Sequence, residues 1–435
     1  MENEIIKEVL LRQQEEKAAI LRGNFVKRDV DMSKQLNNTL IKVIIGPRRA
    51  GKSYFCLQSL KDSTFAYANF DDEKLSKIDD YDDVIKYLKE IYGDFKTVLF
   101  DEIQNLPEWQ LFVNRLQRTG YNIILTGSNS NLLSSELATH LTGRHIQVDI
   151  LPFSFREFVR ARDLENKLDK PYLKDVQGQI LNALGEFIHI GGFPDVIIKN
   201  MEFKSYLSTL VDSITLNDIV KRHNIRFSDS VSTLIRYLIS ASAKEVSLNS
   251  MKKVSGVGSV HTAAKYLDYL KEAFLVFSLD RFSTKVKEQL RSPKKIYFID
   301  NGIINALSFN LRTEEGKLIE NAVAIELLRE SNLFSSFRVF YWKNQNSEVD
   351  FVVKEGLKVK QLLQVSYNVE RESTKQREIK ALISASKELR CDNLLVITWD
   401  YEAEEKIEGK LVRFIPLWKW LLSDWSLSEA NEQKK

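Results

Sequence analysis

Residues 43–53 read Val43-Ile44-Ile45-Gly46-Pro47-Arg48-Arg49-Ala50-Gly51-Lys52-Ser53. The run fits the pattern G-x-x-x-x-G-K-[ST], in which a glycine-rich turn cradles phosphate groups. A β-branched apolar segment, residues 40–45, precedes the turn and predicts a buried strand, and residues 54–60 follow with helical spacing of apolar positions. A strand leading through such a turn into a helix presents backbone N–H groups and a positive helix end to a polyphosphate. The stretch therefore predicts an ATP site.

The residues of this turn have distinct expected roles. Lys52 would reach the β- and γ-phosphates, and the Ser53 hydroxyl would ligate Mg²⁺. Gly46 and Gly51 allow the tight turn and the close approach of the backbone to the nucleotide. The predicted nucleotide-binding set is Gly46, Pro47, Arg48, Arg49, Ala50, Gly51, Lys52, Ser53 and Tyr54.

A second signature is the run Thr97-Val98-Leu99-Phe100-Asp101-Glu102, an apolar strand that ends in two acids. In a parallel sheet these carboxylates would lie at the same edge as the phosphate-binding turn. Asp101 would hold Mg²⁺, usually through water, and Glu102 would orient and deprotonate the attacking water. The pair predicts ATP hydrolysis as well as ATP binding.

Polar residues after a further strand, residues 122–126, are candidates for sensing the γ-phosphate. Ser128 is the first choice and Asn129 the second, and an ordinary cap at a strand-to-helix turn is the alternative for both. Arg144 is a candidate arginine finger acting on the ATP of a neighbouring copy, which would require a homo-oligomer. A surface arginine at a helix end is the alternative.

Length and composition indicate how many hydrophobic cores the chain forms and in which compartment it is expected. With 435 residues the chain is too long for one hydrophobic core, and its net charge of +3 is nearly balanced. Cys56 and Cys391 lie far apart in sequence, which predicts neither a disulfide framework nor a zinc site. The polar N-terminus is unlike a secretory signal, and no apolar run approaches the length of a bilayer span. We therefore expect a cytoplasmic protein with no membrane partner.

Shifts in periodicity divide the chain into five expected parts. Residues 1–37 carry alternating charges and predict a solvated helical segment without chemistry. Residues 38–150 alternate strands and helices, as the parallel sheet of a P-loop ATPase core requires. Residues 151–225 turn helical and predict a lid that closes over the nucleotide, with a passive helical spacer as the alternative. Within the core, strands are predicted at 64–69, 97–100, 122–126 and 146–150, and helices at 81–91 and 109–117.

The positive charge is concentrated in residues 226–310, which hold 13 Lys and Arg against 7 Asp and Glu, a net +6. Helical patterns over 247–254 and 259–273, then strands over 274–279 and 296–299, predict a winged-helix domain. Basic residues on the second helix and between the strands would suit double-stranded DNA. Winged helices also bind proteins, so a protein partner stays open.

Together, GPRRAGKS, LFDEIQNLPEW, LTGSNSNLLSSELATHLTGR and LPFSFREF resemble the prokaryotic AAA-type P-loop ATPases that carry a C-terminal DUF4143 domain. The runs Gly191–Pro194, Lys295–Gly302 and Ser347–Phe351 also match what that family shows, so the resemblance covers nearly the whole chain. It implies an ATPase core, a helical lid, a winged-helix module and an α/β domain similar to PD-(D/E)XK nucleases. It also implies the metal-holding and water-activating roles for Asp101 and Glu102, and a characteristic pair at Arg48 and Arg49.

The last part, residues 311–435, shows the order helix–strand–strand–strand of a restriction-nuclease-like fold. Glu320, Asp350 and Gln364 are the candidate metal ligands of a second site. The lysine that would activate water two residues after Gln364 is replaced by Ser366. Lys375 and Arg377 are candidates to replace it.

Because the amide at Gln364 and the hydroxyl at Ser366 weaken metal binding and water activation together, a degenerate, binding-only domain is the favoured interpretation. The sequence thus predicts a Mg²⁺-dependent ATPase coupled to DNA or to a DNA-bound partner. An ATP-regulated metal-dependent nuclease and an ATP-dependent protein-binding signalling scaffold are the alternatives.

Overall fold

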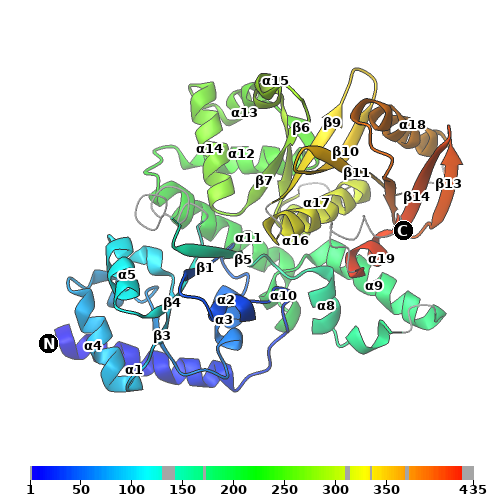
Figure 1. The fold of residues 1–435 in the computed structure, drawn as a ribbon. Coiled ribbons are helices and arrows are strands. Elements are labelled where there is room, and N and C mark those ends of the chain that lie inside the picture. Colours follow the sequence, from blue (N-terminus) through cyan, green and yellow to red (C-terminus); the bar gives the residue numbers. More distant parts are fainter. Residues whose placement is uncertain are drawn as a thin grey trace. The chain divides into compact units, whose positions relative to one another are not determined.

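The computed structural model describes residues 2–129, 143–169, 173–308, 314–333, 336–367 and 372–423 (Figure 1). The chain folds into two compact units. One comprises residues 1–152 and 272–274, and the other comprises residues 153–271 and 275–435.

The first unit is built on a parallel five-stranded sheet in the order β2-β3-β4-β1-β5. The strands and helices predicted for residues 38–150 are present, with bounds within two residues of those expected. In chain order the elements are α1 (Glu2–Leu21), α2 (Ser33–Leu36), β1 (Ile41–Ile45), α3 (Lys52–Ser59), β2 (Phe65–Asn69), α4 (Tyr81–Tyr92), β3 (Thr97–Asp101), α5 (Trp109–Arg118), β4 (Asn122–Gly127) and β5 (His145–Asp149).

Alternate residues of the central strand β1 pack on opposite faces of this sheet. Ile41, Val43 and Ile45 belong to one hydrophobic cluster, together with buried residues of α1, α4 and α5. Ile44 belongs to a second cluster, together with buried residues of α3. Helices thus cover both faces, which explains why β1 reads as an almost continuous apolar run.

The N-terminal segment is not the solvated helix that its charges predict. Ile6, Val9 and Leu10 on α1 are buried in the core of the first unit. The Gln13 amide donates to the carbonyl of Asn69 and accepts from the Asn69 N–H, both at 2.9 Å. The charged residues of α1 lie on its exposed side. Because they alternate along the sequence, they made the whole helix look exposed to solvent.

The second unit contains helices followed by a large mixed sheet. Its elements are α8 (Phe155–Ala161), α9 (Lys174–Ile190), α10 (Pro194–Ile198), α11 (Phe203–Ile214), a π-helical segment (Thr215–Lys221), α12 (Ser228–Ser240), β6 (Lys244–Val246), α13 (Leu248–Ser255), α14 (Val260–Glu272), β7 (Val276–Arg281), α15 (Val286–Arg291), β8 (Lys294–Phe298), α16 (Asn301–Leu307), α17 (Glu315–Leu333), β9 (Phe337–Lys343), β10 (Glu348–Glu355), β11 (Lys358–Ser366), α18 (Glu372–Leu389), β12 (Leu394–Thr398), β13 (Ala403–Ile407), β14 (Lys410–Pro416) and α19 (Leu417–Leu422).

The sheet of this unit has nine strands in the order β13-β14-β12-β11-β10-β9-β7-β8-β6. It runs across residue 310, where the sequence predicts a domain boundary, because β7 pairs in parallel with β9 at Asp280–Phe340 and Arg281–Tyr341. The division of this unit into parts at 151–225, 226–310 and 311–435 stays a prediction, as does the role of its first helices as a lid.

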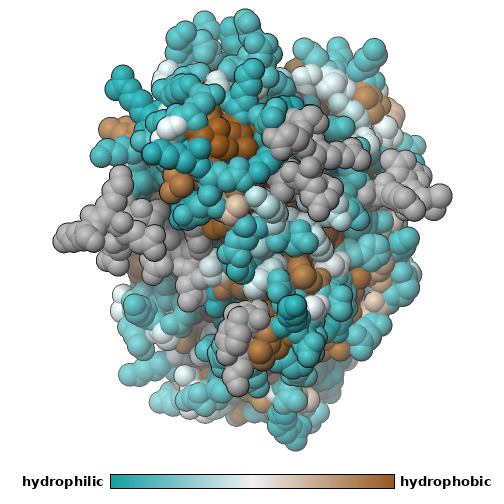
Figure 2. Space-filling model, turned by 90° about the vertical axis from the view of Figure 1, so that its right-hand side faces the viewer, coloured by the Kyte–Doolittle hydropathy of each residue, from teal (hydrophilic) through white to brown (hydrophobic). Residues whose placement is uncertain are grey.

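The face of the molecule drawn in Figure 2 is largely hydrophilic, with hydrophobic areas set among polar residues. Among the residues that the structure describes, no helix is both long and apolar enough to cross a membrane.

Candidate functional site

The phosphate-binding turn follows β1 and depends on glycine at its first position. A Cβ added to Gly46, whose φ is +152°, would lie 1.9 Å from the carbonyl oxygen of Ile150, so no larger residue fits. Gly51 ends the turn at φ +91° and is the N-cap residue of α3. Arg49 also has a positive φ, +65°, which is uncommon for a residue with a side chain and typical of strained functional turns.

Lys52 points into this turn. Its ammonium donates to the carbonyl oxygens of Gly46 at 3.1 Å and of Pro47 at 3.0 Å, and the side chain is 4% exposed. Its Nζ also lies 3.8 Å from Glu102 Oε1. The lysine therefore stands between the turn and the acids of β3, where phosphate oxygens are expected.

Ser53 and Asp101 meet as the sequence predicts. The Ser53 hydroxyl donates to Asp101 Oδ1 at 3.0 Å, and the other carboxylate oxygen accepts from the Tyr67 hydroxyl at 3.1 Å. Thr126, on the neighbouring strand β4, also donates to Asp101. Burial and the nearby charge of Glu102 raise the pKa of the Asp101 carboxyl.

This donor set fits magnesium. Mg²⁺ is usually bound by one or two protein oxygens together with waters and substrate phosphates, not by an all-protein cage. One hydroxyl and one carboxylate oxygen face each other here. Within the described residues no group of three or more His, Cys, Asp or Glu side chains is arranged to hold a metal.

Glu102 is the other acid of the pair, and its backbone has a left-handed φ of +52°. Burial alone would raise the pKa of Glu102, but Lys52, a hydrogen bond from Gln104 and the charge of Arg48 together lower it. The Gln104 amide donates to Glu102 Oε2. Glu102 is therefore ionised at neutral pH, as a proton acceptor must be.

The end of β4 brings two more polar groups to this edge. The Glu102 N–H donates to the Thr126 hydroxyl at 3.0 Å, so one hydroxyl joins both acids. Ser128 is buried, and its Oγ lies 3.4 Å from the Gln104 amide; Asn129 is buried beside it. The structure thus places Ser128 next to Glu102, and Asn129 follows it in the chain. Thr126 and Gln104 were missed from sequence, because ordinary strand and loop residues carry no motif.

The rest of the predicted turn includes both buried and exposed side chains. Pro47 and Ala50 are buried, whereas Arg49 and Tyr54 are exposed. The Tyr54 ring packs edge-on against Phe25, with ring centroids 6.0 Å apart.

Arg28 contacts the phosphate-binding turn. It lies in the N-terminal segment, for which no chemical role was predicted from the sequence. Its guanidinium is buried and donates to the carbonyl oxygens of Ala50 and Leu151. A single arginine thus ties the second half of the turn to the chain after β5. Only tertiary contact reveals this role, since Arg28 lies outside any motif.

Arg144 lies at the opposite edge of the sheet from the turn. Its carbonyl accepts from the N–H of Ile41, the first residue of β1, whereas the turn follows Ile45 at the other end. Four residue steps of about 3.3 Å separate those ends. The structure therefore does not bring Arg144 to the phosphate-binding turn of its own chain.

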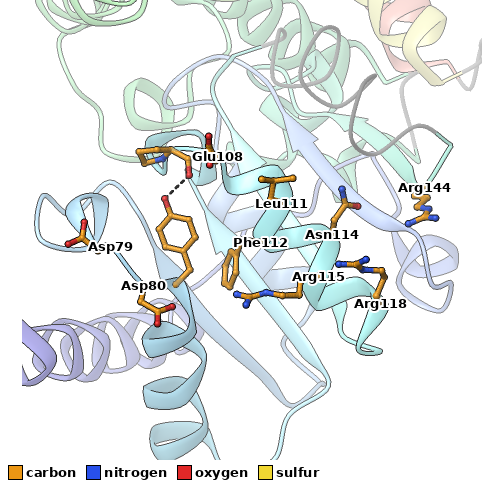
Figure 3. Close-up of a pocket in the computed structure, with 11 residues that line it drawn as sticks. Asp79, Asp80, Glu108, Leu111, Phe112, Asn114, Arg115, Arg118 and Arg144 are labelled. Atoms are coloured by element: carbon orange, nitrogen blue, oxygen red, sulfur yellow. Dashed lines mark hydrogen bonds between the residues drawn. The ribbon is translucent and has the colours of Figure 1, made fainter.

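Arg144 instead lines a cavity of about 670 Å³ beside α5 (Figure 3). Leu111 and Phe112 give this cavity an apolar part, and Arg115 and Arg118 line it together with Arg144. Tyr81 and Pro107 also line the cavity, and the Tyr81 hydroxyl donates to the Pro107 carbonyl at 2.6 Å.

The second unit assembles the other predicted site. The Asp350 N–H donates to Gln364 Oε1 at 3.2 Å, and Asp350 Oδ1 and Glu320 Oε1 both accept from the Lys295 ammonium, at 2.9 and 3.1 Å. Burial and the charge of Asp350 raise the pKa of Glu320 to about 7. Lys295, on β8, was not predicted as a site residue.

The candidates to replace the missing lysine are engaged elsewhere. Lys375 donates to Glu405 at 2.5 Å. Arg377 donates to Glu378 Oε1 at 2.6 Å, and the other oxygen of Glu378 accepts from the Gln364 amide at 2.5 Å. Ser366 is buried at the end of β11. Both cations are therefore paired with glutamates.

Comparisons with known proteins agree with this arrangement of sites. A model of an AAA domain matches residues 38–159, a model of a domain of unknown function (DUF8612) matches residues 181–315, and a model of a domain of unknown function (DUF4143) matches residues 315–420. The last two ranges meet at residue 315, where α17 begins.

Full-length relatives occur in archaea and in bacteria. An uncharacterized protein of Methanocaldococcus jannaschii is 37% identical over 420 residues, which cover 92% of each chain. An uncharacterized protein of Haemophilus influenzae is 29% identical over 421 residues, covering 92% of this chain and 99% of that one. Among solved structures, a Walker-type ATPase of Pyrococcus abyssi aligns over 66% of this chain and 99% of that chain, with 15% identity and a TM-score of 0.42.

The phosphate-binding turn and its two acids occupy the stretch that the AAA model matches, and the full-length relative from Methanocaldococcus jannaschii extends the match over both units. The chain therefore belongs to the family of archaeal and bacterial P-loop ATPases that join an AAA domain to a C-terminal DUF4143 domain.

Proposed function

We propose that this protein binds ATP with Mg²⁺ and hydrolyses it to ADP and phosphate. The observation that carries the proposal is the convergence of Lys52, Ser53 and the Asp101–Glu102 pair at one edge of the sheet. Mg²⁺, when bound, neutralises charge on the β- and γ-phosphates.

The chain's own residues have separable roles in this reaction. Lys52 binds phosphate oxygens, and Ser53 and Asp101 supply oxygen ligands for the metal. Glu102 accepts a proton from the attacking water, and its low pKa keeps it ionised to do so. Thr126 positions both acids, because its hydroxyl contacts Asp101 and the N–H of Glu102.

ATP binding by the full chain tests the nucleotide site. We expect Lys52→Ala to abolish ATP binding in equilibrium dialysis, because the phosphates lose the buried ammonium that points into the turn. Lys61→Ala is the matched control, since Lys61 is an exposed lysine of the same unit, and it should bind ATP as the wild type does. Equal ATP affinity of the Lys52→Ala and wild-type proteins would contradict the site.

The protein acts as a homo-oligomer in this proposal, with Arg144 of one copy stabilising transferred charge on the ATP of the next. Two observations support it. Arg144 is exposed at the sheet edge away from its own phosphate-binding turn, and it lines an open cavity with two further arginines.

We further propose that ATP turnover is coupled to double-stranded DNA. The elements α12, β6, α13, α14, β7 and β8 follow each other in the order of a winged helix, with β8 paired antiparallel to both β6 and β7. Lys253, His261 and Lys265 are exposed on α13 and α14. Lys285, Lys287 and Arg291 are exposed between β7 and β8, where a wing would contact the phosphate backbone.

A salt series with labelled duplex DNA tests this coupling. Affinity should fall steeply as salt rises, and removing one phosphate contact by Lys265→Ala should reduce the slope by about 1. Lys61→Ala is again the control, and its slope should equal that of the wild type. Retention of DNA that does not change with salt, or no binding at all, would favour a protein partner for this surface.

The proposal for residues 315–420 is that they bind without cleaving nucleic acid. The amide of Gln364 and the hydroxyl of Ser366 are weak substitutes for the acid and the lysine of a two-metal nuclease. Wild-type protein incubated with Mn²⁺ and labelled DNA should leave the DNA intact. Cleavage that Asp350→Ala removes would overturn this part of the proposal.

A further inference from the structure

A buried lysine, Lys295, lies between three acidic side chains of the second unit, Glu320, Glu348 and Asp350. The Nζ atom of Lys295 lies 2.7 Å from Glu348 Oε1, 2.9 Å from Asp350 Oδ1 and 3.1 Å from Glu320 Oε1. Its side chain is 2% exposed. The lysine comes from β8, whereas the acids come from β10 and α17, so the contact joins elements on both sides of residue 310.

The remaining oxygens of these acids also have protein donors. Asp350 Oδ2 accepts from the Val365 N–H at 3.0 Å, and Glu320 Oε1, which already accepts from Lys295, also accepts from the Tyr297 hydroxyl at 2.8 Å. Glu348 Oε2 lies 3.2 Å from the Lys343 ammonium. Both oxygens of Asp350, both oxygens of Glu348 and one oxygen of Glu320 therefore already lie against N–H or O–H groups of the chain.

A divalent ion and this ammonium exclude each other. Mg²⁺ requires oxygens at about 2.0–2.1 Å in nearly octahedral geometry, and the positive charge of a lysine in the same space would repel it. Although burial alone would lower the pKa of Lys295, the charges of Asp350 and Glu320 raise it above its usual value. The three carboxylates that surround the ammonium favour its charged form.

We propose that Lys295 is the resident cation of this cluster, and that its ammonium takes the place of the divalent metal that Glu320, Glu348 and Asp350 would otherwise bind. While the ammonium of Lys295 occupies this space, two-metal phosphodiester cleavage cannot take place there. Removing the lysine creates a binding site for a divalent cation. This inference rests on the proposed lack of nuclease activity and extends it, by naming the group responsible.

Mn²⁺ binding, followed by electron paramagnetic resonance without nucleotide, tests the inference. All proteins carry Asp101→Asn, which removes the metal ligand at the ATP site. With Lys295 present, we expect no Mn²⁺ binding that depends on Asp350. With Lys295→Met added, one Mn²⁺ should bind, and a further Asp350→Asn should abolish that binding. Tyr297→Phe, which removes the hydrogen bond to Glu320, should weaken the new site about 10-fold to 100-fold.

Lys343→Met is the matched control, because it removes an ammonium from the rim of the cluster and leaves Lys295 between the acids. It should create no Mn²⁺ site. Lys295→Gln serves as the second variant if Lys295→Met does not fold.

Two results would overturn the inference. One is Mn²⁺ binding, with Lys295 present, that Asp350→Asn removes. The other is a folded Lys295→Met or Lys295→Gln protein that binds no Mn²⁺. Because the readout is metal binding, the second result would leave the proposed absence of nuclease activity standing.

Discussion

At the residue scale, one hydroxyl connects the two acids of the ATP site. Thr126 donates to Asp101 and accepts from the N–H of Glu102, so a single side chain contacts both the proposed metal ligand and the backbone of the proposed proton acceptor. Thr126 itself is fully buried. We therefore assign it a positioning role.

We predict that Thr126→Val, which preserves shape and removes the hydroxyl, destabilises the first unit by about 1–3 kcal/mol, because it leaves the Glu102 N–H without its acceptor and removes one donor to Asp101. It should also lower kcat for ATP hydrolysis and leave the KM for ATP largely unchanged. Urea unfolding and steady-state kinetics measure the two effects. Thr119→Val is the control, since the Thr119 hydroxyl donates to the Leu116 carbonyl at the end of α5. An equally large loss of kcat in Thr119→Val would refute the positioning role of Thr126.

The residues that sequence predicted share a local pattern, and those it missed do not. Lys52 and Ser53 are identified by the glycines around them, and Asp101 and Glu102 by the apolar strand before them. Thr126 and Lys295 act through partners that lie 24 residues or more away along the chain. Such contacts depend on which strands become neighbours, and no short motif encodes strand order.

At the element scale, α1 is part of the ATPase core. Its buried face packs on the cluster formed by the sheet, α4 and α5, and Gln13 on the same helix bonds the end of β2. Charged residues on the other face made the sequence pattern look fully solvated.

Two neighbouring leucines test this packing. Leu10 is fully buried, whereas Leu11 is 41% exposed. Leu10→Ala should lower the free energy of unfolding of the first unit by about 2–5 kcal/mol, because it leaves a cavity in the core. Leu11→Ala should change it by less than about 0.5 kcal/mol. Urea unfolding measures both, and equal losses in the two variants would show that α1 is not part of this core.

A second element-scale contact joins the turn before α10 to the start of α16. Asp300 accepts from the Gly192 N–H at 2.6 Å and from the Gly302 N–H at 2.8 Å. A Cβ on Gly191 would lie 2.0 Å from Asp300 Oδ1, so the turn requires glycine there. Burial outweighs these hydrogen bonds and raises the pKa of Asp300 to about 7.

This raised pKa predicts a specific pH dependence. Between about pH 4 and pH 7 the folded chain holds a proton on Asp300 that the unfolded chain releases. The associated stability is fully present below about pH 4 and is lost as pH rises towards 7, at up to about 1.4 kcal/mol per pH unit. We therefore expect the free energy of unfolding to fall more between pH 5 and pH 8 for the wild type than for Asp300→Asn. Urea unfolding at both pH values measures this difference. An identical change in both proteins would contradict the raised pKa.

At the scale of the whole molecule, the sequence predicted the parallel sheet of the first unit but not the continuity of the second. Alternating apolar strands and helices favour a parallel sheet wherever they occur. The nine-stranded sheet instead depends on β7 meeting β9, and two residue pairs make that contact. A contact made by only two residue pairs leaves no pattern in the local sequence from which the pairing of β7 with β9 could be predicted.

The proposed oligomer predicts complementation between two inactive proteins. Arg144→Ala should bind ATP and turn it over poorly, because its neighbours lack the charge that stabilises the transition state. Lys52→Ala binds no ATP but still supplies Arg144. Mixing the two should therefore restore part of the ATPase rate. Arg118→Ala, from the same cavity, is the control and should be active alone, and a mixture no faster than its components would contradict action between copies.

The central claim is that Glu102 activates the water that attacks bound ATP. Hydrolysis of labelled ATP by the full chain under single-turnover conditions, with Mg²⁺, measures this step directly. We predict that Glu102→Gln binds ATP as tightly as the wild type does and hydrolyses it about 10²-fold to 10⁴-fold more slowly. Hydrolysis by Glu102→Gln at the wild-type rate would contradict the account.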